Sequence, residues 1–186
     1  LLEVLPLVAE RQLAEFCDVF CEKGVFSVEQ SRRLLTAAQA MGIKAKVHAD
    51  EIVTLGGAEL AAEISALSAE HLLHASDAGI RRMAETGVIA VLLPATAFCL
   101  REPYARARFM IDSGVPVALA TDFNPGSCFS ESIPLVIALA ALYMKMTPAE
   151  IVTALTINAA AAVGRADRVG SLEPGKQADF LLLEHP

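Results

Sequence analysis

The chain has 186 residues, enough for one domain with a substantial hydrophobic core. It is 54% hydrophobic and carries a formal net charge of -7, which argues against nucleic-acid binding, since that function requires clustered Lys and Arg. The longest apolar runs, such as Ile133 to Met144, are shorter than the roughly 18 to 20 residues of a membrane span. We therefore expect neither a nucleic-acid nor a membrane partner.

The cysteine pattern and the start of the chain indicate a cytoplasmic protein. The cysteines are Cys17, Cys21, Cys99 and Cys128. No two of them form a CxxC pair, so we expect reduced thiols. Glu10 and Arg11 interrupt the apolar opening, so we expect no secretory signal there.

Strand and helix patterns alternate along the chain. Buried-strand patterns occupy residues 15–21, 44–50, 71–75, 88–95 and 115–122. Helical patterns occupy residues 27–42, 56–67, 76–87, 102–114, 132–146 and 147–164. Ser27, Ser76 and Thr147 are predicted N-caps, and Pro103 is predicted in the first turn of its helix.

Alternating strands and helices without hairpin turns predict an α/β fold with a parallel sheet and right-handed crossovers. Eight such units would make the ~250 residues of a (β/α)₈ barrel, so five units predict the later part of one, about strands 4–8. A doubly wound sheet is the structural alternative. The chain lacks the Gly-rich phosphate loop that usually follows the first strand of that fold.

The C-terminal segment has a different residue pattern from the rest of the chain. Turn residues at Gly170, Pro174 and Gly175 precede a strand-like segment, "ADFLLL", at residues 178–183. We expect residues 1–164 to form the partial barrel and residues 165–186 to return into a small β-sandwich. The partner strands of that sandwich are not visible in this chain.

Imidazole and carboxylate groups recur where the predicted strands end, at His48, His74 and Asp122. The carboxyl ends of barrel strands face one end of the barrel, so these groups should meet there. Imidazole and carboxylate suit Zn²⁺ or Fe²⁺, and a bound metal supplies hydroxide at neutral pH. The pattern predicts a metal-assisted hydrolase in which Asp122 also carries a proton.

Two neighbouring residues receive a structural interpretation. In "HLLH" only one of the two histidines needs to point inward, and we interpret His71 as a structural histidine without a catalytic role. Asp50, directly after a strand, is assigned to a helix cap or a loop. Asp122 taken alone would equally suit a turn.

Four segments resemble the amidohydrolase superfamily and, within it, the imidazolonepropionases of histidine degradation. They are "KVHADE", "HLLHASDAG", "ALATDFNPGS" and "VGSLEPGKQADFLLL". The resemblance covers residues 18–183, and "TDFNPGS" together with "HADE" is its specific part. The last segment marks only the superfamily.

The resemblance implies a role for each matching residue. His48 and Asp122 would be metal ligands for Zn²⁺ or Fe, and Asp122 would also shuttle a proton. His74 would polarise the scissile carbonyl, and Glu51 would contact the substrate ring or the attacking water. The loop that holds substrate and product would contain Asn124, Gly126 and Ser127. The implied reaction opens 4-imidazolone-5-propanoate to N-formimidoyl-L-glutamate.

One departure limits this interpretation. The superfamily takes two further metal ligands from an HxH motif, and the histidines of this chain have no such spacing. We therefore expect the second half of an enzyme, which by itself binds metal weakly and is inactive. The apolar excess would suit a homodimer. Two alternatives stay open: a deaminase of guanine or cytosine type, and a non-catalytic α/β module.

Overall fold

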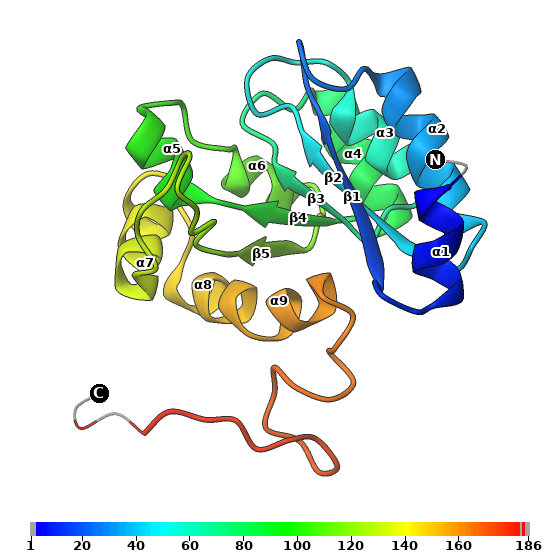
Figure 1. Ribbon diagram of the computed structural model, residues 1–186. Coiled ribbons are helices and arrows are strands. Elements are labelled where there is room, and N and C mark those ends of the chain that lie inside the picture. The colour runs from blue at the N-terminus through cyan, green and yellow to red at the C-terminus, as the bar shows by residue number, and fades with distance from the viewer. Residues whose placement is uncertain (1–2, 183, 185–186) are drawn as a thin grey trace.

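The computed structural model describes residues 3–182 and 184, and its centre is one parallel β-sheet (Figure 1). Its strands are β1 (Phe16–Cys21), β2 (Lys44–Ala49), β3 (Ser68–His71), β4 (Ile89–Leu92) and β5 (Val117–Leu119). They lie side by side in chain order, and every neighbouring pair is parallel. A doubly wound sheet reverses its strand order, so the described strands exclude that alternative.

Short helices connect and follow the strands. They are α1 (Val4–Glu10), α2 (Val28–Gln39), α3 (Gly57–Glu63), α4 (Asp77–Thr86), α5 (Pro94–Leu100), α6 (Ala107–Asp112), α7 (Ile133–Leu142), α8 (Pro148–Leu155) and α9 (Ile157–Ala162). The predicted N-caps at Ser27, Ser76 and Thr147 are confirmed, since each side chain accepts a hydrogen bond from the first turn of its helix. Within the described part, no helix is long and apolar enough to cross a bilayer.

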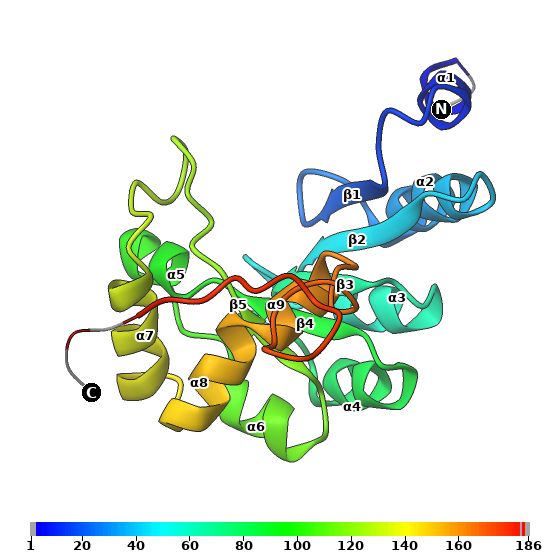
Figure 2. The same cartoon turned by 90° about the horizontal axis from the view of Figure 1, so that it is seen from below.

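The outer face of the sheet packs against α2, α3, α4 and α6, which lie along one side of it (Figure 2). Alternate strand residues point to this face, as the two-residue period of a strand requires. Val47, Leu92 and Val117 are among them, and all are buried in the main apolar core. This face holds most of the buried hydrophobic area that stabilises the fold.

The inner face divides into an apolar and a polar part. Over β4 and β5, Ile89, Val91 and Ala118 pack with Ala162 of α9 in a second apolar cluster. Over β1 to β3 the inner face, with Phe16 and Phe20 of β1 at its edge, carries most of the polar strand residues: Asp18, Lys46, His48, Ser68 and Glu70. The two parts meet where the Lys46 ammonium binds the Ala162 carbonyl at 3.1 Å, at the C-terminal end of α9.

Several predicted boundaries are wrong. The strand predicted over residues 88–95 ends at Leu92, because the unpredicted helix α5 begins at Pro94, and the strand predicted over residues 115–122 spans only Val117–Leu119. The third strand ends at His71 instead of running through residues 71–75, because Leu72 enters the left-handed region at φ 60° and cannot extend the strand. The helix predicted to contain Pro103 begins only at Ala107. The last predicted helix is interrupted at Thr156, where φ -119° and ψ -94° separate α8 from α9.

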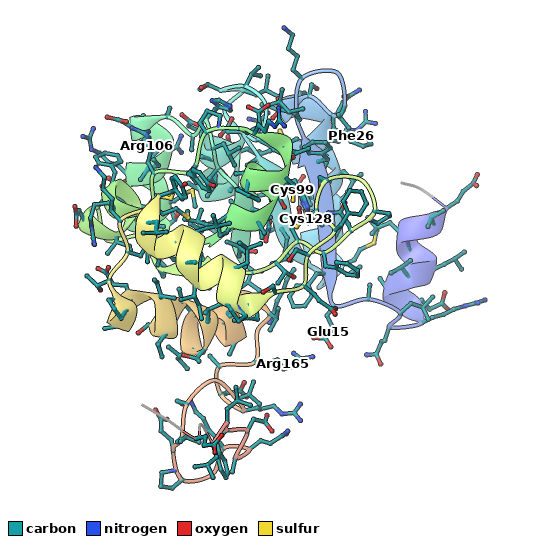
Figure 3. The ribbon with its side chains drawn as sticks, turned by 90° about the vertical axis from the view of Figure 1, so that its left-hand side faces the viewer. Glu15, Phe26, Cys99, Arg106, Cys128 and Arg165 are labelled. Atoms are coloured by element: carbon teal, nitrogen blue, oxygen red, sulfur yellow. The ribbon has the colours of Figure 1, made fainter. Side chains whose placement is uncertain are left out.

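The tail does not form the predicted strand over residues 178–182, and position 183 lies outside the described residues. An isolated strand has no partner for its backbone groups, so the segment stays extended and exposed. The return into a β-sandwich is therefore not present in the described residues. The tail is tied to the sheet at its start, where Arg165 meets Glu15 at 2.6 Å (Figure 3).

Candidate active site

A pocket of about 590 Å³ opens where the strands end at their carboxyl side. Its chemically active lining comes from four side chains: His48, Glu51, His71 and Asp122. The rest of the lining is Phe20, Ile52, Leu100, Glu102, Asn124, Gly126 and Ser127. The predicted convergence of strand-end groups is therefore present, with one histidine exchanged for another.

His48 reaches the pocket from the inner face of β2. Its Nδ1 lies 2.6 Å from Asp18 Oδ2, and its ring centroid lies 5.2 Å from that of His71. Burial by itself would lower the pKa of His48, but Asp18, together with the charges of Glu70 and Asp122, outweighs burial and holds that pKa above its ordinary value. With Nδ1 against Asp18, the ring has Nε2 left for a ligand.

His71 is the last residue of β3 and is nearly fully buried. Its Nδ1 lies 3.5 Å from Glu51 Oε1. Burial and then the charge of His48 hold the pKa of His71 well below its ordinary value, while burial raises the pKa of Glu51. The pocket therefore favours the neutral forms of both side chains.

His74, which the sequence placed at the strand tip, does not line the pocket. It lies three residues beyond the strand, where its N–H donates to the Asp50 carbonyl at 2.8 Å and its carbonyl accepts from Thr54 at 2.7 Å. The apolar Leu72 and Leu73 between the histidines made the strand seem to continue. Only the register that pairs Ala49 with His71 shows where it ends.

Asp122 follows β5 at the pocket edge. Its Oδ2 accepts a hydrogen bond of 2.7 Å from Thr96, a residue that the sequence did not single out. Asp122 and His71 both adopt positive φ, at 53° and 70°. Side-chain-bearing residues rarely take this conformation, and such strain gathers at functional sites.

The predicted substrate loop is closed by the Asn124 side chain. Asn124 Oδ1 accepts from the backbone N–H groups of Gly126 and Ser127, each at 2.8 Å. Asn124 Nδ2 donates to the Asp122 carbonyl at 2.7 Å and to Ser127 Oγ at 2.9 Å. Asn124 therefore shapes the loop next to Asp122, and its amide is largely used within the loop.

Two buried carboxylates hold the loop after β2. Asp50 accepts backbone hydrogen bonds from residues 55–58 at 2.8 to 3.1 Å, which confirms its interpretation as a helix cap. Glu22 accepts from Ile52 at 2.9 Å and from Lys23 at 2.7 Å. Glu22 directly follows β1, and the tertiary fold brings its carboxylate beside Ile52.

The pocket carries a partial donor set for a metal. His48 and Asp122 offer imidazole nitrogen and carboxylate oxygen, which suit Zn²⁺ or Fe²⁺. A smaller hollow of about 340 Å³ at the opposite strand ends is lined by neither an acid nor an imidazole. The donors of the larger pocket fit such a metal in kind but not in number, because three or four ligands are usual.

Comparisons with known proteins identify the family of the chain. The model of the amidohydrolase family matches residues 22–185. Imidazolonepropionase of Phocaeicola vulgatus is 68% identical over 181 residues, which are 97% of this chain and 44% of that protein. Imidazolonepropionase of Bacteroides thetaiotaomicron is 69% identical, over 97% of this chain and 43% of its own length. The chain thus spans less than half the length of these relatives.

Two solved structures share the fold. An adenosine deaminase from Xanthomonas campestris with bound zinc aligns with a TM-score of 0.72 and 24% identity, over 83% of this chain and 40% of its own. A mutant atrazine chlorohydrolase from Arthrobacter aurescens, complexed with zinc and atraton, aligns with a TM-score of 0.72 and 18% identity, over 94% and 46%. With the family model matching most of its length, the chain belongs to the amidohydrolase family.

Proposed function

We propose that this chain is the later part of an imidazolonepropionase, which hydrolyses 4-imidazolone-5-propanoate to N-formimidoyl-L-glutamate. One observation carries the proposal: His48, Glu51, His71 and Asp122 line one pocket at the carboxyl ends of parallel strands. The 68% identity to the enzyme of Phocaeicola vulgatus supports 4-imidazolone-5-propanoate as the substrate.

The metal would be Zn²⁺ or Fe, held by His48 and Asp122. When bound, it would supply Lewis acidity and a water of lowered pKa. The two ligands leave the site incomplete, so the remaining ones would come from outside this chain. The isolated chain should therefore bind metal weakly and be inactive.

Asp122 would take the proton of the attacking water and deliver it to the leaving nitrogen. Thr96 supports this role, because its hydroxyl occupies Oδ2 and holds the carboxylate in one orientation. Oδ1 has no hydrogen bond from the described residues and remains for the pocket.

His71 takes the role that the sequence suggested for His74, polarisation of the scissile carbonyl. Its ring lies in the pocket, and its lowered pKa keeps the imidazole neutral near pH 7. A neutral imidazole can donate one N–H to the carbonyl oxygen as negative charge develops there. Glu51, 3.5 Å from His71, would then contact the substrate ring.

The loop from Asn124 to Ser127 would border the substrate. Its proposed contribution is shape, because Asn124 holds the N–H groups of Gly126 and Ser127. This hydrogen bonding fixes the pocket wall beside Asp122.

The finer architecture also belongs to this proposal. The five strands would be strands 4–8 of a (β/α)₈ barrel, with residues 1–164 in the barrel and residues 165–186 passing into a small β domain. The apolar helix α7, with Leu142 exposed, would suit a homodimer. The free cysteines are consistent with a cytoplasmic enzyme.

The paired variants His71→Gln and His74→Gln test the proposal in the complete polypeptide that contains this chain. His71→Gln replaces the fixed imidazole N–H with a flexible amide donor and should lower kcat/KM for 4-imidazolone-5-propanoate by about 10²- to 10³-fold. His74→Gln is the matched control and should retain near-native kcat/KM, because His74 lies outside the pocket.

Three results would contradict the proposal. An equal loss of kcat/KM in His71→Gln and His74→Gln would contradict the assignment of carbonyl polarisation to His71. Deamination of guanine or cytosine, without turnover of imidazolonepropanoate, would move the protein to a deaminase. Turnover by the isolated chain of 186 residues would show that no further ligands are needed.

A further inference from the structure

Two carboxylates lie beneath the pocket on the inner side of His48. Asp18 places Oδ2 2.6 Å from His48 Nδ1. Potential ligand atoms of Asp18, His48 and Glu70 all lie within 4.8 Å of one another. Neither carboxylate lines the pocket, and Asp18 contacts His48, which does.

This cluster has the donor types of a second cation site, but its charge balance opposes one. The Lys46 ammonium lies 2.9 Å from Glu70 Oε1 and also binds the Ala162 carbonyl. A divalent cation would sit beside that fixed positive charge. It would also occupy Nδ1 and compete with the contact between His48 and Asp18.

Asp18 is better placed than Glu70 to act on the imidazole. Asp18 pairs with Lys46 across β1 and β2, so it lies on the same face as His48, one diagonal step along the strands. Glu70 contacts Lys46 and, at 2.5 Å, the Ser68 hydroxyl through Oε1, and its buried Oε2 has no hydrogen-bond partner among the described residues. Of the two carboxylates, Asp18 is the one in contact with the imidazole, with Oδ2 2.6 Å from Nδ1. The carboxylate of Asp18 is therefore the acceptor available to Nδ1–H.

We propose that Asp18 is a positioning residue for His48: its carboxylate accepts the Nδ1–H, fixes the tautomer and ring orientation, and presents Nε2 to the pocket. The 2.6 Å separation is within hydrogen-bond distance, and in this conformation the two groups are not aligned as a hydrogen bond. Carboxylates commonly orient metal-binding histidines in this way. The metal-dependent part of this inference rests on the proposed function, whereas the tautomer is a property of the chain itself.

The tautomer can be measured directly in the metal-free chain. With ¹⁵N-labelled histidine at about pH 9, above the usual titration range of imidazole, long-range ¹H–¹⁵N spectra distinguish Nδ1–H from Nε2–H. The His48 signals are assigned by their loss in His48→Gln. We expect the Nδ1–H tautomer in the native chain and a several-fold shift toward Nε2–H in Asp18→Ala.

Two further variants control this measurement. Asp18→Asn keeps a carbonyl oxygen near Nδ1 and should preserve most of the native tautomer. Glu15→Ala removes a carboxylate at the start of the same edge strand, where it pairs with Arg165, and should leave His48 unchanged. A native chain with the Nε2–H tautomer overturns the proposal even if Asp18→Ala fails to fold.

Zinc titration of the complete polypeptide provides the second readout. Asp18→Ala should weaken Zn²⁺ binding by about 10- to 100-fold, and Glu15→Ala should not. Unchanged Zn²⁺ affinity in Asp18→Ala overturns the positioning role and leaves a metal-dependent hydrolase intact. Absence of stoichiometric metal from every variant instead contradicts the proposed function and leaves the tautomer result standing.

Discussion

The two faces of the sheet differ in what they bury. On the outer face, Val47, Leu92 and Val117 pack under helices in one continuous apolar core. On the inner face, the apolar cluster under α9 gives way to Lys46, Glu70 and His48 over the first three strands. The same strands therefore contribute to the hydrophobic core on one side and to chemistry on the other.

A parallel sheet can therefore hold polar groups on one face and remain stable through the other face. Outer-face burial provides most of the favourable free energy. The inner-face groups are tolerated because they are paired: Lys46 with Glu70, His48 with Asp18, and Asp122 with Thr96. The comparison predicts different consequences for substitutions on the two faces.

The largest expected effect comes from breaking a polar pair on the inner face. Lys46→Met leaves the buried Glu70 carboxylate without its cation and should lower the free energy of unfolding by about 3–5 kcal/mol. The double variant Lys46→Met/Glu70→Leu should recover most of this loss, because no unpaired charge remains. Urea unfolding measures both. If Lys46→Met has the same free energy of unfolding as the native chain, the pairing of Lys46 with Glu70 does not stabilise the fold.

On the outer face, Leu92→Ala should destabilise through a cavity. Leu92 is fully buried, so the truncation should cost about 2–5 kcal/mol of unfolding free energy. Unlike Lys46→Met, no second substitution of a charged neighbour should rescue it. Thermal and urea unfolding of the two variants, compared side by side, check this. A loss well under 1 kcal/mol would mean that the outer core can collapse around the gap.

A smaller effect is expected where α3 approaches the end of β2. A Cβ built on Gly57 would lie 2.7 Å from Ala49 Cβ and 2.9 Å from Ala49 Cα. Because backbone cannot yield as a flexible side chain does, Gly57→Ala should lower the free energy of unfolding by about 1–3 kcal/mol. The double variant Gly57→Ala/Ala49→Gly relieves part of the clash and should be the more stable of the two. The opposite order would show that Ala49 is not the obstacle.

The smallest effect concerns an ion pair in the helical layer. Arg108 binds both Glu150 carboxylate oxygens, at 2.8 and 2.9 Å, and this hydrogen bonding lowers the pKa of Glu150 to about 2. The pair therefore stabilises the folded chain above the unfolded pKa of about 4.3, and the stabilisation disappears as the pH falls toward 2.

Partial exposure limits this contribution to about 1 kcal/mol or less. Arg108→Gln should be less stable than the native chain near pH 6, and the difference should shrink progressively below about pH 4. Urea unfolding across this pH range measures it, with the exposed Arg33→Gln as control. If the difference in unfolding free energy between Arg108→Gln and the native chain is the same at every pH, it does not arise from ionisation of Glu150.

Much of the fold could be predicted because its signals are local. The capping residues Ser27, Ser76 and Thr147 mark helix starts through hydrogen bonds within one turn. His48 lies near the end of β2 and Asp122 lies shortly after β5, and both line the pocket. Their convergence followed from the parallel sheet that the alternating pattern predicted.

Errors arose where the deciding contact is distant in sequence. The choice between His71 and His74 depends on where β3 ends against β2 and on the left-handed backbone at His71 and Leu72, which the apolar Leu72 concealed. Thr96 and Asp18 have no distinguishing motif, since each matters only through a partner on another segment. The strand predicted at residues 178–182 failed because a strand needs a partner as well as a suitable composition.

Local sequence signals account for the alternation of strands and helices, the helix caps and the family resemblance, because each depends on nearby residues or on a short motif. Only the tertiary structure decided which histidine enters the pocket beside Asp122, and that Asp18 stands behind His48. The physical reason is that strand register and side-chain pairing are fixed by packing between segments, and a one-residue change of register sends every side chain to the opposite face.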